Sequence, residues 1–499
     1  MKKPQKVLLN ALIILLLLLA GPTQAHDHNI PSAVSGAPAA DILDFYAFMN
    51  PPCTVVGGSG CEAPPEELIL ALTVNPSATK DSRFSDSVVY HIYFENDVGL
   101  RNQIDCSINA EQMITCAGLN GLSVTAPVGE VGVNGDIRVF AGLRDDPAFL
   151  DTAALKMFET TGVAAFSPPG VDGFAGNNVL AIVVGIKNNS FPAGSGSTDT
   201  NGHPINVQKS WVVSENTGAV FNAGISGSWY NPNQDGQGWV IEMISANQFL
   251  FYFYGYDDAG NQLWLLGLTD NIDGSTVTVD TLRFSGMGFG GNFDPTSKSY
   301  ESVGSTIFEF SDCSTATVSF TPSVSDLDGF VTSAERLSSI ATLDCAFLSM
   351  GQLDRVGRPM TSSLIPEEKR DAYKANSDPS TWDSLYRADI EASLTAIDMA
   401  DGIAGNYFYS PSVLAPVMAD DRLSVDLEWS ACHGVWGFEL SELVPQPHTN
   451  DCGGRGLDDD VLEELLSMVI SGFDPMYDDF VRANDVPFLT EFPFLAAPH

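Results

Sequence analysis

The spacing of apolar residues predicts β-strands through the first half of the chain. β-branched and aromatic residues recur over short runs, and turns rich in Gly and Pro separate these runs. The predicted strands are Ile42–Met49, Leu68–Val74, Ser87–Phe94, Ile137–Leu143 and Val179–Ile186. The chain up to about Trp211 is therefore expected to be mainly β.

From Gly224 onward Trp, Tyr and Gly follow one another closely. Short polar turns between the apolar runs are typical of an antiparallel meander. Its predicted strands are Trp239–Ile244, Phe249–Tyr256, Gln262–Leu268, Ser275–Phe284, Ser305–Phe310 and Thr315–Phe320. Along Phe249–Tyr256, strand alternation places the three Phe side chains on one face and the three Tyr side chains on the other.

After Pro359 the apolar residues recur every three or four positions, which indicates helices. One helix opens at Pro366 with two acids in its first turn, and two more are predicted over Asp383–Met399 and Asp458–Ile470. The predicted fold class is mainly β with a helical C-terminal region (α+β). We expect antiparallel, sandwich-like sheets and an inserted β-meander domain.

Charge narrows the range of partners. Of the 499 residues 63 are Asp or Glu and only 23 are Lys or Arg, so the formal net charge is −40. Binding to nucleic acid needs clustered cationic side chains, so we expect no nucleic-acid partner. The 44% hydrophobic content is sufficient for packed cores and argues against disorder.

The N-terminus predicts secretion. Lys2, Lys3 and Lys6 precede the apolar run Ala11–Ala20, and Thr23-Gln24-Ala25 supplies small residues for cleavage. Residues 1–25 are interpreted as a signal peptide, so the protein is expected in the periplasm or outside the cell. No later apolar run approaches the roughly 20 residues of a membrane span, so no membrane partner is expected after cleavage.

The eight cysteines fit an oxidising compartment. Eight thiols allow 105 pairings, and the simplest prediction joins sequence neighbours. The predicted disulfides are Cys53 with Cys61, Cys106 with Cys116, Cys313 with Cys345 and Cys432 with Cys452. No pair has the C-x-x-C spacing of a zinc or redox motif.

Segments near both ends of the mature chain resemble the secreted bacterial family known as domain of unknown function 4331. The resemblance implies no established activity. The segments that carry it are Ala40–Phe48, Val139–Pro147, Gly176–Val179, Gln352–Pro359, Ile365-Pro366, Gly456–Val461, Ala483–Asp485 and Phe492–His499. The opening His26–Pro31 departs from the family, which tends to show His-Arg-Glu there.

About 130 residues interrupt this family pattern, and they resemble a Trp/Tyr/Gly-rich β module of secreted proteobacterial proteins. Surface loops tolerate inserted domains when their ends lie close together. We therefore predict a signal peptide over 1–25, a split domain over 26–216 and 352–499, and an inserted β domain over 217–351.

Three patterns could hold a metal ion. A free amine at His26 with His28 in the third position can bind Cu(II) in a square plane of nitrogens, although a terminus without any such role is the alternative. Asn231–Glu242 has the spacing of an EF-hand calcium loop, but its strand-like flanks favour a simple turn. The acid pairs Asp145-Asp146 and Asp458–Asp460 could also bind calcium, and we expect them to be solvated instead.

Aromatic side chains in the middle domain suggest ligand binding. Trp229, Tyr230, Trp239 and Trp264 could form a stacking platform for a carbohydrate or contact a protein partner, and core packing is the alternative. No nucleophile elbow, zinc-protease motif, phosphate loop or dinucleotide motif occurs. The predicted function is a binding or structural protein. The alternative is a hydrolase or metal-dependent enzyme with a site assembled across the split domain.

Overall fold

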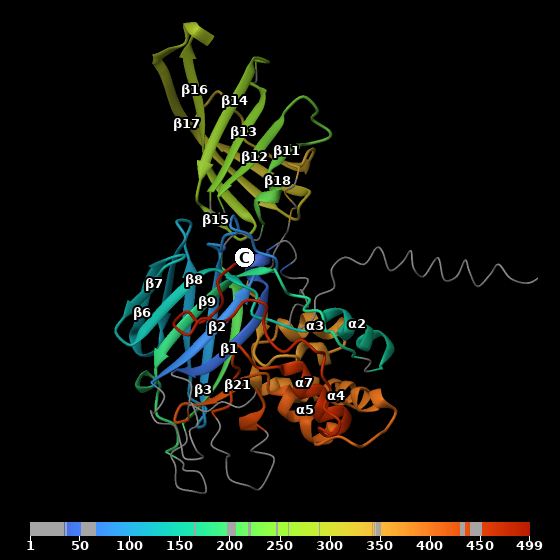
Figure 1. The fold of residues 1–499 in the computed structure, drawn as a ribbon. Helices are drawn as coiled ribbons and strands as arrows, with labels where there is room; N and C mark the ends of the chain where they lie inside the picture. Colours follow the sequence, from blue (N-terminus) through green and yellow to red (C-terminus); the bar gives the residue numbers. More distant parts are fainter. Residues whose placement is uncertain are drawn as a thin grey trace, which may run out of the picture.

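A computed structural model describes residues 34, 37–50, 66–163, 166–196, 206–217, 221–245, 248–257, 259–288, 290–341, 343, 345, 351–429, 435–439 and 452–499. These residues form three antiparallel sheets, with a few helices mostly in the C-terminal half (Figure 1). The predicted mainly β class is confirmed. The predicted signal peptide and the residues His26, His28, Cys53, Cys61 and Cys432 lie outside the described residues.

Two of the sheets face each other across one large core. The first has the order β1 (Ile42–Asn50), β2 (Glu67–Val74), β9 (Asn178–Lys187), β8 (Ile137–Asp145), β7 (Val131–Asn134). The second has the order β20 (Gly351–Val356), β10 (Val207–Asn216), β3 (Val88–Asn96), β4 (Arg101–Ile108), β5 (Met113–Gly118), β6 (Leu122–Pro127). Strands β1, β2 and β9 are buried on both faces, which explains their nearly continuous apolar sequences.

Strand β10 joins the N-terminal and C-terminal parts of the chain. On one side it pairs with β3, and on the other its first half pairs with β21 (Leu423–Asp426) and its second half with β20. The chain leaves β10 at Asn216 and returns at Gly351, and these two residues are partners in the ladder. Everything between them is therefore inserted at a single point of the sheet.

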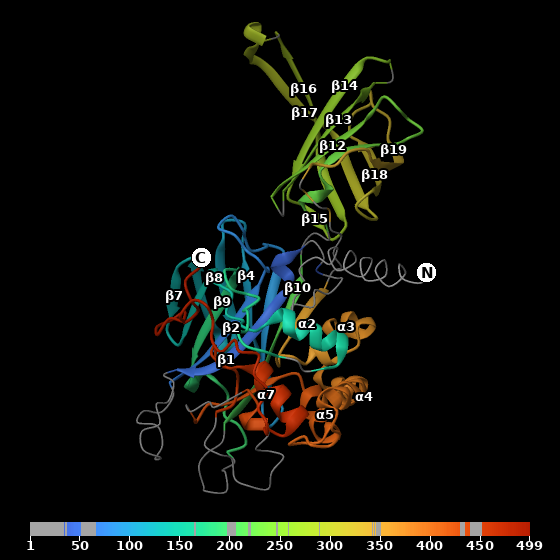
Figure 2. The same cartoon turned by 45° about the vertical axis from the view of Figure 1, so that its right-hand side comes forward.

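The helices cover the same core. They are α2 (Thr152–Thr161), α3 (Glu367–Lys374), α4 (Pro379–Asp398), α5 (Pro411–Ala419) and α7 (Val461–Leu466). In α4, Trp382, Tyr386, Ile390 and Leu394 recur every four residues and are buried against the sheets. The predicted helix from Asp458 begins at Val461, because Asp460 is its N-cap and accepts a hydrogen bond from the Glu463 N–H. Figure 2 shows α3, α4, α5 and α7 grouped on one side of the sheets.

The third sheet is a closed ring with a core of its own. Its strands are β11 (Gly227–Tyr230), β12 (Gly238–Ser245), β13 (Gln248–Tyr256), β14 (Gln262–Thr269), β15 (Ile272–Asp273), β16 (Thr276–Met287), β17 (Asp294–Phe310), β18 (Thr315–Pro322) and β19 (Phe330–Arg336). Pairing of β14 with β16 closes the meander (Figure 1). We call this unit the ring. Its apolar cluster contains no residue of the split core. Independent folding of residues 217–351 stays a prediction.

Two of the predicted disulfides are present. Cys106 and Cys116 face each other directly in the β4–β5 ladder with Cα atoms 4.1 Å apart, and Cys313 bonds to Cys345 beside the ring. Cys452 is also disulfide-bonded. These bonds are consistent with an oxidising compartment. Within the described residues no helix is both long and apolar enough to cross a membrane.

Four buried ion pairs link the C-terminal segments to the sheets. The pairs are Arg355–Asp421, Arg358–Glu439, Lys374–Asp354 and Arg455–Asp44, with N–O distances of 2.6, 2.6, 3.2 and 2.6 Å. The Arg355 guanidinium also lies 3.9 Å from the ring centroid of Trp382 and donates a hydrogen bond to the Tyr373 carbonyl. Arg355 therefore helps to hold α3 and α4 on β20, together with the Lys374–Asp354 pair.

We expect Arg355→Met to lower the free energy of unfolding by about 3–5 kcal/mol, because it leaves the Asp421 carboxylate buried without its cation. Chemical unfolding monitored by circular dichroism measures the change. The control is Arg387→Met, which removes the exposed i,i+4 partner of Asp383 and should leave the midpoint nearly unchanged. Equal effects of the two substitutions would contradict this account of the buried pair.

Candidate functional site

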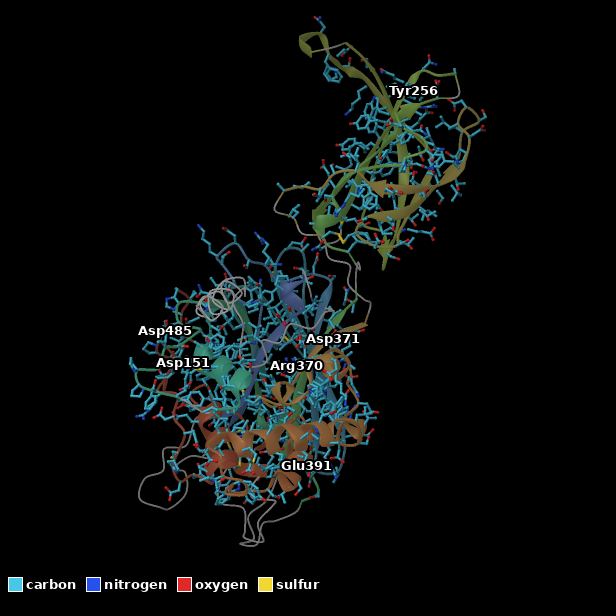
Figure 3. All side chains as sticks on the ribbon, turned by 90° about the vertical axis from the view of Figure 1, so that its right-hand side faces the viewer. Asp151, Tyr256, Arg370, Asp371, Glu391 and Asp485 are labelled. Carbon is cyan, nitrogen blue, oxygen red and sulfur yellow. A yellow bond between two sulfur atoms is a disulfide. The ribbon has the colours of Figure 1, made fainter. Side chains whose placement is uncertain are left out.

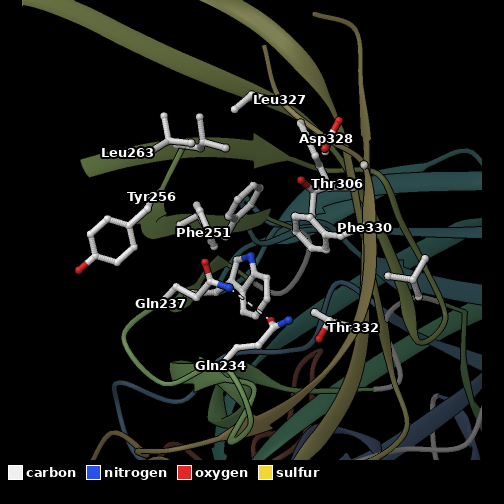
Figure 4. A pocket seen from close by; sticks show the side chains of 16 residues that line it. Gln234, Gln237, Phe251, Tyr256, Leu263, Thr306, Leu327, Asp328, Phe330 and Thr332 are labelled. Atoms are coloured by element: carbon white, nitrogen blue, oxygen red, sulfur yellow. Dashed lines mark hydrogen bonds between the residues drawn. The ribbon is translucent and has the colours of Figure 1, made fainter. Parts of the chain in front are cut away.

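The ring encloses a cavity of about 240 Å³ at one of its ends. Apolar side chains form most of its inner wall, polar groups lie at the rim, and the surface of the whole cavity is about equally polar and apolar (Figure 4). The lining side chains of the wall come from β12, β13, β14, β17 and β18 and are Trp239, Phe251, Phe253, Leu263, Leu265, Thr306 and Phe320. Cavities at the ends of closed sheets are common ligand sites.

The β11–β12 turn supplies two amides to the rim. The Asn231 side chain accepts a hydrogen bond from the Asn233 N–H, and its Nδ2 donates to Thr332 Oγ1 at 2.6 Å. This arrangement fixes the turn against β19 and places Gln234 and Gln237 side by side, with their amides hydrogen-bonded at 3.3 Å (Figure 4). The segment with EF-hand spacing is therefore a turn between two strands, and its polar residues serve the cavity.

The β18–β19 turn supplies the rest of the rim, with both polar and apolar side chains. Asp328 is exposed in the β18–β19 turn and is the one carboxylate among the lining residues, while Leu327 and Phe330 flank it. Thr306 lies deeper, and its hydroxyl is already hydrogen-bonded to Thr281 at 2.7 Å. The cavity thus offers apolar side chains in its interior, with two neutral amides and one carboxylate at its entrance.

The structure separates the four predicted ligand-binding aromatics. Trp229 is 1% exposed, and its Nε1 donates to the Ile225 carbonyl, so it packs in the ring core. Trp239 is also buried but lines the cavity, whereas Tyr230 is half-buried on β11 and is not a lining residue. Trp264 points outward and is 44% exposed. Alternation along β13 is confirmed, because its three Phe residues face inward and Tyr254 and Tyr256 are exposed.

Trp264 belongs to a row of aromatic side chains on the outer face of the ring, which we call the aromatic row. Tyr254 is directly opposite Trp264 in the β13–β14 ladder, and Phe284 is directly opposite Tyr300 in the β16–β17 ladder. The Trp264 and Phe284 rings are parallel within 8°, with centroids 5.5 Å apart. This stacking connects the β13–β14 pair to the β16–β17 pair. Four strands therefore contribute one continuous exposed row.

Buried acids gather at two places in the split domain. Asp145 and Asp146 are 1% and 2% exposed, so the expectation that they are solvated is wrong. Asp145 is the last residue of β8 and Asp146 follows it. Asn484 donates a hydrogen bond to Asp145 at 2.6 Å, and His499 lies beside it. Burial raises the pKa of Asp145, and the Asn484 hydrogen bond opposes that rise.

The second group is Asp460, Glu463 and Asp479, whose carboxylate oxygens lie within 4.8 Å of one another. Burial raises the pKa of Asp460 to about 7. Burial and the neighbouring carboxylates raise the pKa of Glu463 to about 8, and hydrogen bonds from Glu463 and Arg482 lower the pKa of Asp478 to about 2. The hydrogen bond between these two carboxyl groups contributes to both shifts, in opposite directions.

His91 has a structural arrangement. Its Nδ1 lies 2.7 Å from Asp105 and its Nε2 lies 2.9 Å from Glu215, so it bridges three strands of the second sheet. No nucleophile lies among these contacts. The sequence did not point to Gln234, Gln237 or Asp328, because a turn rich in Asn, Gln, Asp and Gly looks the same whether or not it borders a cavity.

The Asp460 group should make stability depend on pH. Both raised carboxyls have pKa values near 4 in an unfolded chain, so the native state binds their protons more tightly. The stabilisation is complete below about pH 4 and is lost as the pH rises through about 7 to 8. We expect the melting temperature to fall as the pH rises from about 4 to about 8, and we expect Glu463→Gln to reduce this fall. Melts between pH 4.5 and 8.5 test this against Glu159→Gln, an exposed control on α2 that should follow the unmodified protein.

Comparisons of the chain with protein-family models, with curated proteins and with solved structures find no match. The resemblance to domain of unknown function 4331 therefore stays a prediction. The site must be interpreted from its own geometry.

Proposed function

We propose that this chain is a secreted or periplasmic binding protein, and that the ring cavity takes a small ligand with an apolar body and a hydrogen-bonding end. The cavity is the observation that supports this proposal. Its volume of about 240 Å³ lies below the roughly 300–1,000 Å³ of sites for drug-sized ligands, so the ligand is small. The neutral amides at the rim favour hydroxyl, amide or carbonyl groups over a strong charge.

The distribution of polar groups supports binding over catalysis. The hydroxyl of the lining residue Thr306 is hydrogen-bonded to the buried Thr281, and Gln234 and Gln237 share a hydrogen bond at the rim. No lining residue is a His, Cys or Lys. Apolar walls with a few placed polar groups hold and orient a ligand, whereas general acid–base chemistry needs a titratable pair within reach of the reacting atoms.

Filling the cavity should weaken binding. We expect Leu263→Trp, which enlarges a lining side chain, to weaken binding of the apolar dye N-phenyl-1-naphthylamine by about tenfold, since overpacking costs roughly 1–3 kcal/mol. Dye fluorescence titration measures the dissociation constant. The control is Leu268→Trp, the same substitution on the outward face of the same strand, where Leu268 is 50% exposed.

Leu268→Trp should bind the dye as the unmodified protein does. If the unmodified protein does not bind the dye, or if both variants bind it equally well, the cavity is not a ligand site. Melting temperatures of the two variants establish that each one folds.

A second candidate is carbohydrate binding at the aromatic row. The alignment of Tyr254, Trp264, Phe284 and Tyr300 across four strands favours it, because sugars stack their C–H faces on aromatic rings. Trp264 and Phe284 cover part of each other, so the contact falls mainly on the two tyrosines, which are 53% and 66% exposed. Because two of its four rings stack on each other and have less free surface for a sugar, the aromatic row ranks second to the ring cavity.

Retention on insoluble cellulose and chitin tests the row. We expect Tyr300→Ser to weaken retention about threefold to tenfold, the equivalent of one aromatic contact. Phe293→Ser is the matched control, because Phe293 is an exposed aromatic residue outside the row. Retention that is absent from the start, or equal in both variants, would exclude the row as a carbohydrate site.

A further inference from the structure

Segments far apart in the sequence meet at the C-terminal end of β8. Asp145 ends that strand, Asp485 belongs to the long C-terminal segment, and His499 is at the end of the same segment. His499 Nε2 lies 2.9 Å from Asp145 Oδ1 and 3.3 Å from Asp485 Oδ2. One potential ligand atom from each of the three residues thus lies within 4.8 Å of the other two. We call these residues the β8 triad.

Backbone and amide groups hold each member of the triad in place. Asn484 Nδ2 donates to Asp145 Oδ2 at 2.6 Å, the Gly176 N–H donates to Asp485 Oδ2 at 2.9 Å, and the His499 N–H donates to Asn178 Oδ1 at 2.9 Å. These three hydrogen bonds orient Asp145, Asp485 and His499, in the same way that residues around a metal site orient its ligands. Figure 3 shows Asp485 on the side of the split domain away from Arg370 and Asp371.

One atom of the triad lacks a hydrogen bond. Asp145 is 1% exposed, and its Oδ1 has no hydrogen-bond partner, although His499 Nε2 is only 2.9 Å away. The contact therefore lacks the alignment of a good hydrogen bond, although His499 still lowers the pKa of Asp145. A buried carboxylate oxygen without a hydrogen bond is costly, and it points toward the space shared with His499 and Asp485.

Charge at the triad is also unbalanced. Burial raises the pKa of Asp172 to about 6, and the charges of Asp485 and Asp145 add to that rise. Among the described ion pairs, neither Asp145 nor Asp485 contacts a Lys or Arg. Two carboxylates thus contact one imidazole, so a cation there would neutralise a net negative charge.

We propose that Asp145, Asp485 and His499 bind a first-row divalent transition metal, for which Zn²⁺ is the probe, at a site that joins the two parts of the split domain. This site is separate from the ring cavity and goes beyond the proposed binding function. One imidazole and two carboxylates suit Zn²⁺ or Mn²⁺, whereas Ca²⁺ prefers oxygen ligands alone. Partial exposure of Asp485 and His499, at 28% and 36% of their side chains, leaves room for water as a further ligand.

The experiment is calorimetric titration of the chelator-treated full-length protein with Zn²⁺. We expect one tight site per chain, and Asp485→Asn and His499→Gln should each weaken it by at least about tenfold, since loss of even a supporting residue costs that much. Glu463→Gln is the matched control from the other acid group, and His28→Ala tests the predicted N-terminal metal site. Both controls should keep the affinity of the unmodified protein.

A second measurement does not depend on the variants folding. X-ray absorption of the zinc-loaded protein should show a first shell of nitrogen and oxygen at roughly 2.0–2.2 Å, without sulfur. The competing explanation is a plain ion pair between an imidazolium and two carboxylates, and it predicts no stoichiometric zinc. Absence of zinc binding, loss of binding in Glu463→Gln or His28→Ala alone, or preference for Ca²⁺ over Zn²⁺ would each overturn the proposal.

Discussion

Pairing along strand β10 is the interaction on which the rest of the molecule depends. Its one edge carries β3, and its other edge carries β21 and β20 end to end, so strands from both parts of the chain share one ladder. Trp211 lies near the junction of these two partners, fully buried and stacked on Tyr93 with centroids 5.0 Å apart. Without the C-terminal strands this edge would expose unpaired backbone groups, so the split domain is complete only when both parts are present.

The same strand explains how an inserted ring can be accommodated. Because Asn216 and Gly351 are ladder partners, the chain leaves and re-enters the sheet at neighbouring positions, and the two cores share no residue. Insertion at such a point adds little chain-closure cost, since the entropy of a loop grows only slowly with its length. Substitutions of residues that line the cavity of the ring therefore leave the packing of the split domain unchanged.

Local patterns predicted the long apolar strands and the helices α3, α4 and α7, and the elements that were missed have physical causes. Strand β4 was overlooked because polar residues separate its buried Ile104, Cys106 and Ile108, a weaker pattern than the apolar runs of β2 or β9. Helix α5 was overlooked because it contains Pro416 and is largely apolar, which removes the helical periodicity. The cavity and the triad could not be predicted, since both join side chains whose proximity depends on the closure of a ring or the path of the C-terminal segment.

The chain has too few Lys and Arg side chains to pair with its acids, and this shortage affects how each buried carboxyl group is stabilised. With 63 acids and 23 Lys or Arg, at least 40 acids cannot have a basic side-chain partner of their own. The buried pairs at Arg355, Arg358, Lys374 and Arg455 use four of these bases where C-terminal segments dock. At Glu463 the remaining charge is relieved by a proton, which a carboxylic acid can share with its neighbour. At Asp145 the described partner in an ion pair is the His499 imidazole and not a Lys or Arg, and this difference is the reason for proposing an external cation at the β8 triad.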